Sequence, residues 1–262
     1  MISQSPNYWN DIAKTWQQTK QQKLLRSVSD ILNNRLFDAW LPAEKVPSLL
    51  KTDLFDESLT DGLYPLLSRY ADRITGIDVS NNIVTAAKQR HPQLDTVKTD
   101  VRHLPFTSES FDIIVSNSTL DHFETSDDII ASITELKRVL RKDGQLMITL
   151  DNYTNPTIFL RNTLPYNALN HLGIVPYYVG KTFGVRRLRR VLEELEFTVL
   201  EITSFWHFPR ILLVMMANAI DRFHSNPQKQ RLINGVLAFE YLSQLPTKYL
   251  TGQFIAAKAV KM

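Results

Sequence analysis

The sequence predicts an α/β fold built on a mostly parallel sheet, because short β-type runs alternate with amphipathic helical stretches between residues 46 and 150. A hydrophobic content of 44% in 262 residues is enough for one sizeable core. Ser80 and Ser126 are the expected N-caps of the helices that follow them. The expected strands span residues 48–52, 73–77, 96–99, 111–116 and 145–150, and the expected helices between them span 63–70, 81–90 and 127–140.

We expect two regions along the chain. Residues 1–45 form a helical N-terminal extension, since apolar residues recur there at helical spacing. Residues 46–262 form the main domain, which continues with a helix at 185–195, a strand at 197–202 and a last strand at 253–261. Insertions at about 153–185 and 205–250 are expected on the substrate side of this domain.

The composition excludes several kinds of site. Cysteine is absent, which rules out disulfides, thiolate metal sites and a cysteine nucleophile, and no cluster of metal ligands is evident, so we expect no metal. Lys and Arg number 30 against 27 Asp and Glu, a formal net charge of +3 with no long run of one sign. Nucleic-acid binders usually concentrate basic residues on one face, so we expect no nucleic-acid partner.

The N-terminal segment is polar and lacks the apolar stretch of a secretory signal, which predicts a cytoplasmic protein. The longest apolar run, residues 211–220, has ten residues, about half of the roughly 20 needed to cross a bilayer. It is expected to be a buried or interfacial helix rather than a transmembrane one. An interfacial helix would allow peripheral membrane contact.

Acidic residues follow the ends of the first three expected strands, at Asp53, Asp78 and Asp100. In an open parallel sheet, ligands bind beyond the carboxyl ends of the strands. Asp78 is placed to accept hydrogen bonds from ribose hydroxyls, and capping of the next helix is the alternative. Asp100 and Val101, followed by the segment Leu-Pro-Phe, suit an adenine base, and a plain βα turn is the alternative.

Four segments together carry a family resemblance: GIDVS at 76–80, DVRHLPF at 100–106, SFDIIVSNSTLDHF at 110–123 and ELKRVLRKDGQLMITLDN at 135–152. In this order and spacing they resemble the core of class I S-adenosylmethionine-dependent methyltransferases, particularly the bacterial type 11 group, over about residues 46–152. The resemblance implies a Rossmann-like, doubly wound, seven-stranded, mostly parallel sheet with an antiparallel last strand. It also implies S-adenosylmethionine as the cofactor, bound across the first four strand ends.

By this resemblance Asp78 would hold the ribose, Asp100 and Val101 the adenine, and Ser116 and Asn117 would border the methionine half. Val79 beside Asp78 is also expected at the cofactor. The family's first strand normally leads into a glycine-rich loop, whereas this chain has no glycine before Gly62. Gly62 lies 16 residues before Asp78, near the place of the family's last loop glycine, so the loop is expected to be lengthened rather than deleted.

Thr52, Asp53 and Gly62 are the residues of this loop that we expect at the cofactor. Acidic residues here, namely Asp53, Asp56 and Glu57, would attract the cationic sulfonium and ammonium groups of the methyl donor and would repel a pyrophosphate. A solvated acidic loop is the alternative. We expect Asp53, Asp78 and Asp100 to converge on one cationic nucleoside.

His122 is the candidate general base, because it follows the fourth strand and an imidazole can accept a proton near neutral pH. Asp121 beside it could orient the ring or bind substrate, and a purely structural histidine is the alternative. Tyr8 and Trp9 resemble the N-terminal helix that lies over the cofactor in many of these enzymes, with core packing as the alternative. The expected acceptor pocket draws on Asn152, Tyr153, Arg161, Tyr177, Tyr178, His207 and Arg210.

The sequence therefore predicts an S-adenosylmethionine-dependent methyltransferase that acts on a small-molecule acceptor, at oxygen rather than at nitrogen or carbon. The basic helix with Arg186, Arg187, Arg189 and Arg190, together with residues 211–220, would suit an anionic or lipid-linked acceptor, and a solvated helix face is the alternative. An inactive methyltransferase-like binding or scaffold protein is the second hypothesis. An NAD(P)-dependent oxidoreductase is the third, although no G-x-G-x-x-G motif is present.

Overall fold

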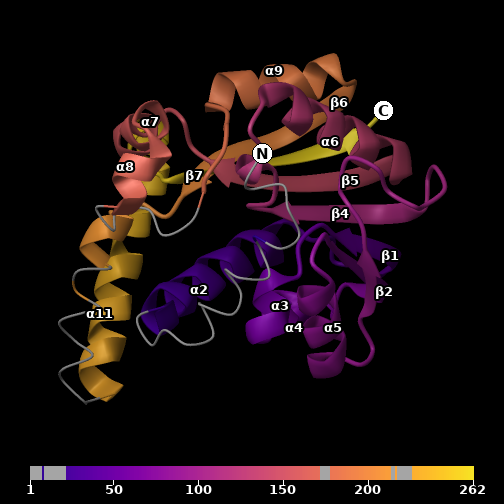
Figure 1. Ribbon diagram of the computed structural model, residues 1–262, viewed down its shortest axis with the longest axis horizontal. Helices are drawn as coiled ribbons and strands as arrows, with labels where there is room; N and C mark the ends of the chain where they lie inside the picture. The colour runs from indigo at the N-terminus through magenta and orange to yellow at the C-terminus, as the bar shows by residue number, and fades with distance from the viewer. Residues whose placement is uncertain (1–7, 9–21, 172–177, 214–215, 217–225) are drawn as a thin grey trace.

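A seven-stranded sheet forms the centre of the protein in a computed structural model, which describes residues 8, 22–171, 178–213, 216 and 226–262. The strand order is β3-β2-β1-β4-β5-β7-β6 (Figure 1). β7 runs antiparallel to both of its neighbours, and the other paired strands are parallel. The strands are β1 (Val46–Lys51), β2 (Ala71–Asp78), β3 (Asp95–Lys98), β4 (Phe111–Asn117), β5 (Leu140–Asp151), β6 (Phe197–Phe205) and β7 (Phe254–Lys261).

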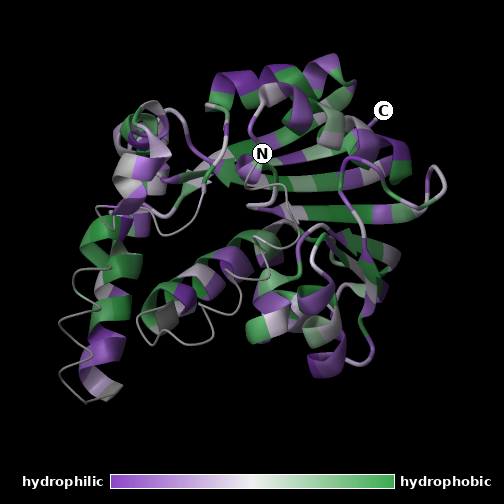
Figure 2. Cartoon of the chain, in the orientation of Figure 1, coloured by the Kyte–Doolittle hydropathy of each residue, from purple (hydrophilic) through white to green (hydrophobic). Residues whose placement is uncertain are grey.

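Helices cover both faces of this sheet (Figure 1). Neighbouring residues of a strand point to opposite faces, so that Leu49 packs into one apolar cluster and Leu50 into the other. The first cluster includes residues of α2 (Gln22–Trp40), α5 (Asn81–Arg90) and α11 (Asn226–Ala238), and the second includes residues of α6 (Ser126–Val139) and α9 (Val185–Glu194). Figure 2 shows the apolar strands between helices whose outer faces are polar. The predicted fold class is confirmed.

Side-chain caps mark the starts of α5 and α6. The Ser80 hydroxyl accepts a hydrogen bond from the Ile83 N–H at 3.2 Å and caps α5 as predicted. The prediction for Ser126 is wrong by one residue, because Thr125 caps α6 by accepting from the Asp128 N–H at 3.1 Å. The remaining short elements are α7 (Pro156–Thr163), α8 (Tyr166–His171), α12 (Lys248–Thr251), η1 (Leu120–His122) and η2 (Phe239–Gln244).

The loop after β1 differs from the expectation. It contains a helical turn, α3 (Phe55–Leu59), before Gly62, and the helix expected at 63–70 shrinks to α4 (Tyr64–Leu67). The segment between β1 and Gly62 is therefore partly helical.

The predicted N-terminal extension is helical over α2, whereas most of residues 1–21, including Trp9, lie outside the described residues. Of the apolar run 211–220 only residues 211–213 and 216 are described. Ile211 and Leu212 are exposed there, and Leu213 is buried. Within the described segments, no helix has the length and apolar character of a membrane span.

Candidate functional site

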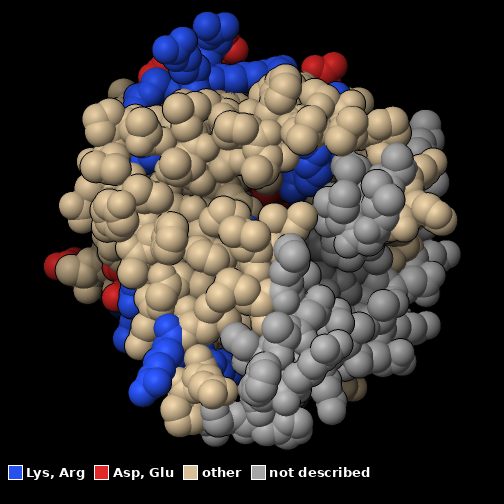
Figure 3. Space-filling view, turned by 90° about the vertical axis from the view of Figure 1, so that its left-hand side faces the viewer, with Lys and Arg blue, Asp and Glu red and all other residues tan. Residues whose placement is uncertain are grey.

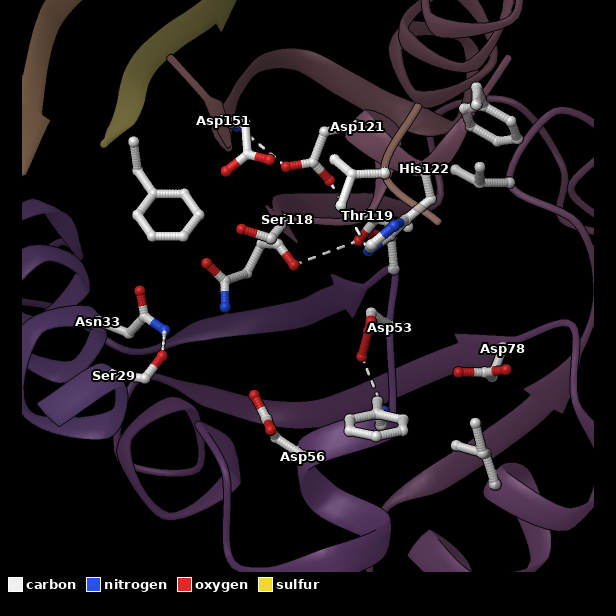
Figure 4. A pocket seen from close by; sticks show the side chains of 18 of the residues that line it. Ser29, Asn33, Asp53, Asp56, Asp78, Ser118, Thr119, Asp121, His122 and Asp151 are labelled. Carbon is white, nitrogen blue, oxygen red and sulfur yellow. Dashed lines mark hydrogen bonds and ion pairs between the residues drawn. The ribbon is translucent and has the colours of Figure 1, made fainter. Parts of the chain in front are cut away.

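A cavity of about 250 Å³ lies at the carboxyl ends of β1, β2 and β4. Its walls also include residues of α2 together with Phe205, Trp206 and Arg210, which come from distant parts of the chain. Figure 4 shows Asp78 at one side of this cavity, Ser29 and Asn33 at the other, and Asp53 between them. Figure 3 shows a hollow that opens among uncharged residues, with Lys or Arg atoms at its rim and Asp or Glu atoms inside it.

Most of the residues predicted for the site lie in this one cavity. Asp53, Asp78 and Asp100 all line it, so the structure brings the three strand-end carboxylates together. The other predicted residues in its wall are Thr52, Val79, Val101, Asn117, Asp121 and His122. Gly62 and Ser116 do not line the cavity.

Asp78 lies deep in the cavity wall at the end of β2. Its Oδ1 accepts a hydrogen bond from the Ser80 N–H at 2.8 Å, and its Oδ2 accepts a longer one from the Leu54 N–H at 3.4 Å. Burial, followed by the charge of Asp53, raises the pKa of Asp78 to about 7. The cap of α5 is Ser80, so Asp78 is not the residue that caps this helix.

Asp53 and Asp56 bring further negative charge to the cavity from the loop after β1. The Asp53 Oδ1 accepts a hydrogen bond from the Phe55 N–H at 2.7 Å. Burial, followed by the charges of Glu57 and Asp53, raises the pKa of Asp56 to about 7. A cluster with such raised pKa values is stabilised by a cation, because a nearby positive charge favours the ionised carboxylates.

Gly62 does not line the cavity but lies beneath the loop, against the side chain of Glu57. It has a φ of 53°, and a Cβ at this position would lie 2.5 Å from Glu57 Oε1. The same Oε1 accepts a hydrogen bond from the Leu63 N–H at 2.9 Å, and Glu57 Oε2 lies 2.8 Å from Lys51 Nζ. Glycine is therefore required here for the backbone to pass over a buried carboxylate.

Asp100 is bound by the guanidinium of Arg102, with 2.6 Å between Oδ2 and Nη2. Burial of Asp100 opposes ionisation, but the hydrogen bonds from Arg102 are together stronger and hold the pKa of Asp100 below its usual value. Arg102 also pairs with Asp128 at 2.7 Å. The adjacent Val101 N–H donates no hydrogen bond within the described chain, which leaves a backbone donor for a base edge.

Hydroxyl and amide groups join the ends of β1, β4 and β5. The Thr52 hydroxyl donates to Ser116 Oγ at 3.1 Å and lies 2.8 Å from Thr119 Oγ1. The Thr149 hydroxyl donates to Asn117 Oδ1 at 2.8 Å. Ser116 is fully buried and contacts Thr52 from behind the cavity wall.

His122 and Asp121 line the cavity on η1. His122 Nδ1 lies 3.4 Å from the Tyr178 carbonyl oxygen, and its Nε2 lies 3.9 Å from Asp121 Oδ1. Asp121 Oδ2 accepts a hydrogen bond from the Asp151 N–H at 2.9 Å, whereas Oδ1 is buried without a hydrogen-bond partner in the described residues. Burial, followed by the charge of Asp151, raises the pKa of Asp121 to about 6.

Tyr8 reaches the same region, since its hydroxyl accepts a hydrogen bond from the Tyr178 N–H at 2.6 Å. The Tyr178 backbone thus joins Tyr8 to the carbonyl that faces His122. This places one predicted N-terminal aromatic residue beside the segment that borders the cavity.

The end of the cavity opposite Asp78 is aromatic, and sequence reasoning missed most of it. Phe205 and Phe254 stack with 5.3 Å between ring centroids, and Trp206 meets Phe254 edge-on at 6.0 Å. Ser29 and Asn33 of α2 line the cavity as well. These residues come from three segments, and no local motif links the segments.

Among the described residues expected in the acceptor pocket, Arg210 alone lines this cavity. His207 and Asn152 are buried and hydrogen-bonded to protein groups, including Thr251 Oγ1 and the Gly252 carbonyl respectively. Tyr177 lies outside the described residues. Arg161 and Tyr178 line a smaller neighbouring pocket, and Tyr153 and the four arginines of α9 line neither. In the described part of the chain no group of three acidic or histidine side chains could hold a metal ion.

Comparison with known families supports the expected resemblance. Residues 60–148 match a family described as a methyltransferase domain, which confirms the resemblance to class I methyltransferases. The demethylmenaquinone methyltransferase of Staphylococcus aureus (strain MRSA252) is 27% identical over 153 residues, which are 50% of this chain and 60% of the relative. A probable tRNA methyltransferase 9B of Mus musculus is 37% identical over 73 residues, 28% of this chain and 16% of the relative.

A solved structure shares the fold. It is phosphoethanolamine N-methyltransferase 2 of Haemonchus contortus in complex with phosphomonomethylethanolamine and S-adenosylhomocysteine, with a TM-score of 0.56 at 16% identity. The match covers 87% of this chain and 52% of that chain. The chain spans less than two thirds of the length of these relatives. Because one relative is named for tRNA, the comparisons do not support our expectation that nucleic acid is excluded.

Proposed function

Because residues 60–148 match the methyltransferase domain family, we propose that the protein is an S-adenosylmethionine-dependent methyltransferase. The observation that carries the proposal is the convergence of Asp53, Asp56 and Asp78 on one cavity at the carboxyl ends of the strands. The donor is a cation with a ribose and no phosphate, so its charge matches these carboxylates. A dinucleotide would bring its pyrophosphate against them.

We assign the donor contacts as follows. Asp78 retains acceptor capacity for the ribose hydroxyls, since each of its oxygens accepts a single backbone hydrogen bond. The Val101 N–H reads the adenine edge, and Asp100 keeps this turn in place through Arg102. Asp53 and Asp56 face the ammonium and sulfonium charges, while Thr52 and Asn117 border the methionine half. Gly62 and Ser116 support these residues from outside the cavity.

We further propose that His122 is the general base for transfer to an acceptor oxygen. The Tyr178 carbonyl at 3.4 Å favours the tautomer with hydrogen on Nδ1, which leaves the Nε2 lone pair to take the acceptor's proton. Asp121 would stabilise the imidazolium that forms, because its buried Oδ1 is only 3.9 Å from Nε2. The donor supplies an activated methyl group, so the chain has to position the acceptor and accept one proton.

Calorimetry with S-adenosylmethionine and S-adenosylhomocysteine tests the donor site. The proposal expects both to bind and expects Asp78→Ala to weaken both, because the ribose would lose its acceptor. Binding of neither ligand would contradict the enzyme assignment and favour a methyltransferase-like scaffold. Binding of NADH instead, seen as quenching of tryptophan fluorescence, would favour the oxidoreductase.

The acceptor is a small molecule in this proposal. The segments 153–185 and 205–250 supply part of the cavity wall through Val179, Phe205, Trp206 and Arg210. The relative named for demethylmenaquinone gives one example of a small acceptor in a similar chain.

A further inference from the structure

Arg210 brings a positive charge to the aromatic end of the cavity. The Arg210 Cζ lies 5.4 Å from the ring centroid of Trp206 and 5.6 Å from that of Phe254. Arg210 makes no ion pair and no hydrogen bond to a side chain or backbone group among the described residues. Within the part of the chain that the structure describes, the guanidinium therefore keeps its hydrogen-bond donors available while it lines the cavity.

Another guanidinium near this region, that of Arg161, is already neutralised. Arg161 Nη2 lies 2.6 Å from Asp151 Oδ2, and both side chains are largely buried. Asp151 lines the cavity, so among the described residues a carboxylate pairs with Arg161 and none pairs with Arg210. Removal of Arg210 from water on acceptor binding would be costly unless the acceptor itself carries an anion.

Trp206, whose ring lies beneath Arg210, has an uncommon backbone conformation. Trp206 has a φ of 60°, a region that bulky residues rarely adopt. The Glu240 carboxylate accepts hydrogen bonds from the backbone N–H groups of Trp206 at 3.1 Å and of His207 at 2.8 Å. Glu240 is thus a positioning residue that fixes the turn on which Trp206 and Arg210 lie.

We infer that the acceptor is an amphipathic anion, with a planar apolar body against Phe205, Trp206 and Phe254 and a carboxylate or phosphate on Arg210. The inference rests on the proposed methyltransferase function and names the substrate class of the same cavity. Apolar rings bury the body, and the guanidinium gives the site its specificity for charge. The four arginines of α9 take no part, since they do not line the cavity.

A set of four probes with one aromatic body tests this inference: 2-naphthoate, 2-naphthyl phosphate, 2-naphthylmethanol and 2-naphthylmethylamine. Their affinities are measured by calorimetry on the full chain with S-adenosylhomocysteine present. We expect at least one of the two acids to bind about tenfold or more tightly than the alcohol, and the amine to bind most weakly. The preferred acid tells whether the site takes a carboxylate or a phosphate.

Arg210→Met should lower the affinity for the preferred acid until it equals the affinity for the alcohol. The matched control is Arg187→Met, because Arg187 also lies over an aromatic ring, Phe183 at 4.6 Å, but outside the cavity. Glu240→Ala should weaken the acid about as much as Arg210→Met while leaving the affinity for S-adenosylhomocysteine unchanged. If Glu240 only stabilised the fold, Glu240→Ala would lower the affinities for the acid and for S-adenosylhomocysteine together.

Equal affinities for acids and alcohol, failure of every probe to bind, or an acid preference that survives Arg210→Met would overturn the inference. Binding of S-adenosylhomocysteine alone is measured first, which separates the two proposals. If it fails to bind but the acids bind through Arg210, the methyltransferase proposal falls and the anion site stands. If it binds and the acids do not, only the anion site falls.

Discussion

Lys51 and Glu57 form a buried ion pair beneath the loop that follows β1, with 2.8 Å between Nζ and Oε2. Both side chains are at most 4% exposed. The Lys51 ammonium also donates to the Asp53 carbonyl, and the Glu57 carboxylate accepts from the Leu63 N–H. The loop has no glycine before Gly62, and these charged contacts hold together the segment that carries Asp53 and Asp56.

Lys51→Met should lower the free energy of unfolding by about 3–5 kcal/mol, because it leaves a buried carboxylate without its partner. Urea unfolding measures this change. The double variant Lys51→Met/Glu57→Leu removes both charges and should be less destabilised than Lys51→Met alone. If the double variant lost as much free energy of unfolding as the two single variants together, the two charges would not be coupled as the structure indicates.

Gly62→Ala should destabilise the protein by about 1–3 kcal/mol, since alanine is strained at a φ of 53° and its Cβ would meet the Glu57 carboxylate. Gly235→Ala is the control. Gly235 lies in α11 with open space around its Cβ position, so alanine there should be neutral or stabilising by about 0.5–1 kcal/mol. Thermal or urea unfolding of the two variants compares them, and equal effects would argue against the role given to Gly62.

Because the pKa of Asp56 is raised, we predict how the free energy of unfolding changes with pH. The pKa of Asp56 is about 7 in the folded protein, whereas the ordinary pKa of an aspartate is 3.8, so the folded state binds more protons between these values. Stability from this group therefore falls as pH rises from about 4 to about 7. Asp56→Asn removes this dependence and should stabilise the ligand-free protein by about 2 kcal/mol more at pH 8 than at pH 5.5.

Urea unfolding of both proteins at the two pH values measures this difference. Comparison with the variant is needed because burial lowers the pKa of His207, which makes an opposite contribution near pH 6. A stabilisation that is the same at both pH values would mean that Asp56 is not held protonated in the cavity.

His122→Ala should lower turnover by about 10²–10⁴-fold while leaving the affinity for S-adenosylhomocysteine unchanged, because the ring is assigned to proton transfer. Methyl transfer from labelled donor into a deproteinised metabolite extract gives the readout without an identified acceptor. His103→Ala is the control, since His103 is exposed and outside the cavity. Full turnover in His122→Ala would remove the base assignment.

The strand ends were predictable because their signals are local. An acidic residue that follows the end of a β-type run places Asp53, Asp78 and Asp100 at one edge of a parallel sheet whatever the details of packing. Ser80 was found as a cap for the same reason. Thr125 was missed because Ser126 beside it, the first residue of α6, also carries a hydroxyl and was predicted as the cap instead. Gly62 was expected at the cofactor, whereas it lies outside the cavity and against Glu57. This contact could not be predicted, because it depends on how the loop folds.

The aromatic end of the cavity could not be predicted in this way. Trp206 and Phe254 come together because β6 and β7 are neighbours in the sheet, with Phe205 paired to Phe254. The anchor at Glu240 lies 34 residues beyond Trp206, and nothing in the local sequence links the two. His207 was predicted for the acceptor pocket, yet it is buried beside the cavity, because Trp206 in its left-handed conformation turns the chain at this point.

A crystal structure of the protein grown with S-adenosylhomocysteine tests the donor site most directly. Our account predicts density for the nucleoside in the cavity, with the ribose hydroxyls on Asp78, the adenine edge on the Val101 N–H and the amino-acid part beside Asp53. A nucleoside bound elsewhere, or a cavity that stays free of it at saturating ligand, would contradict the account.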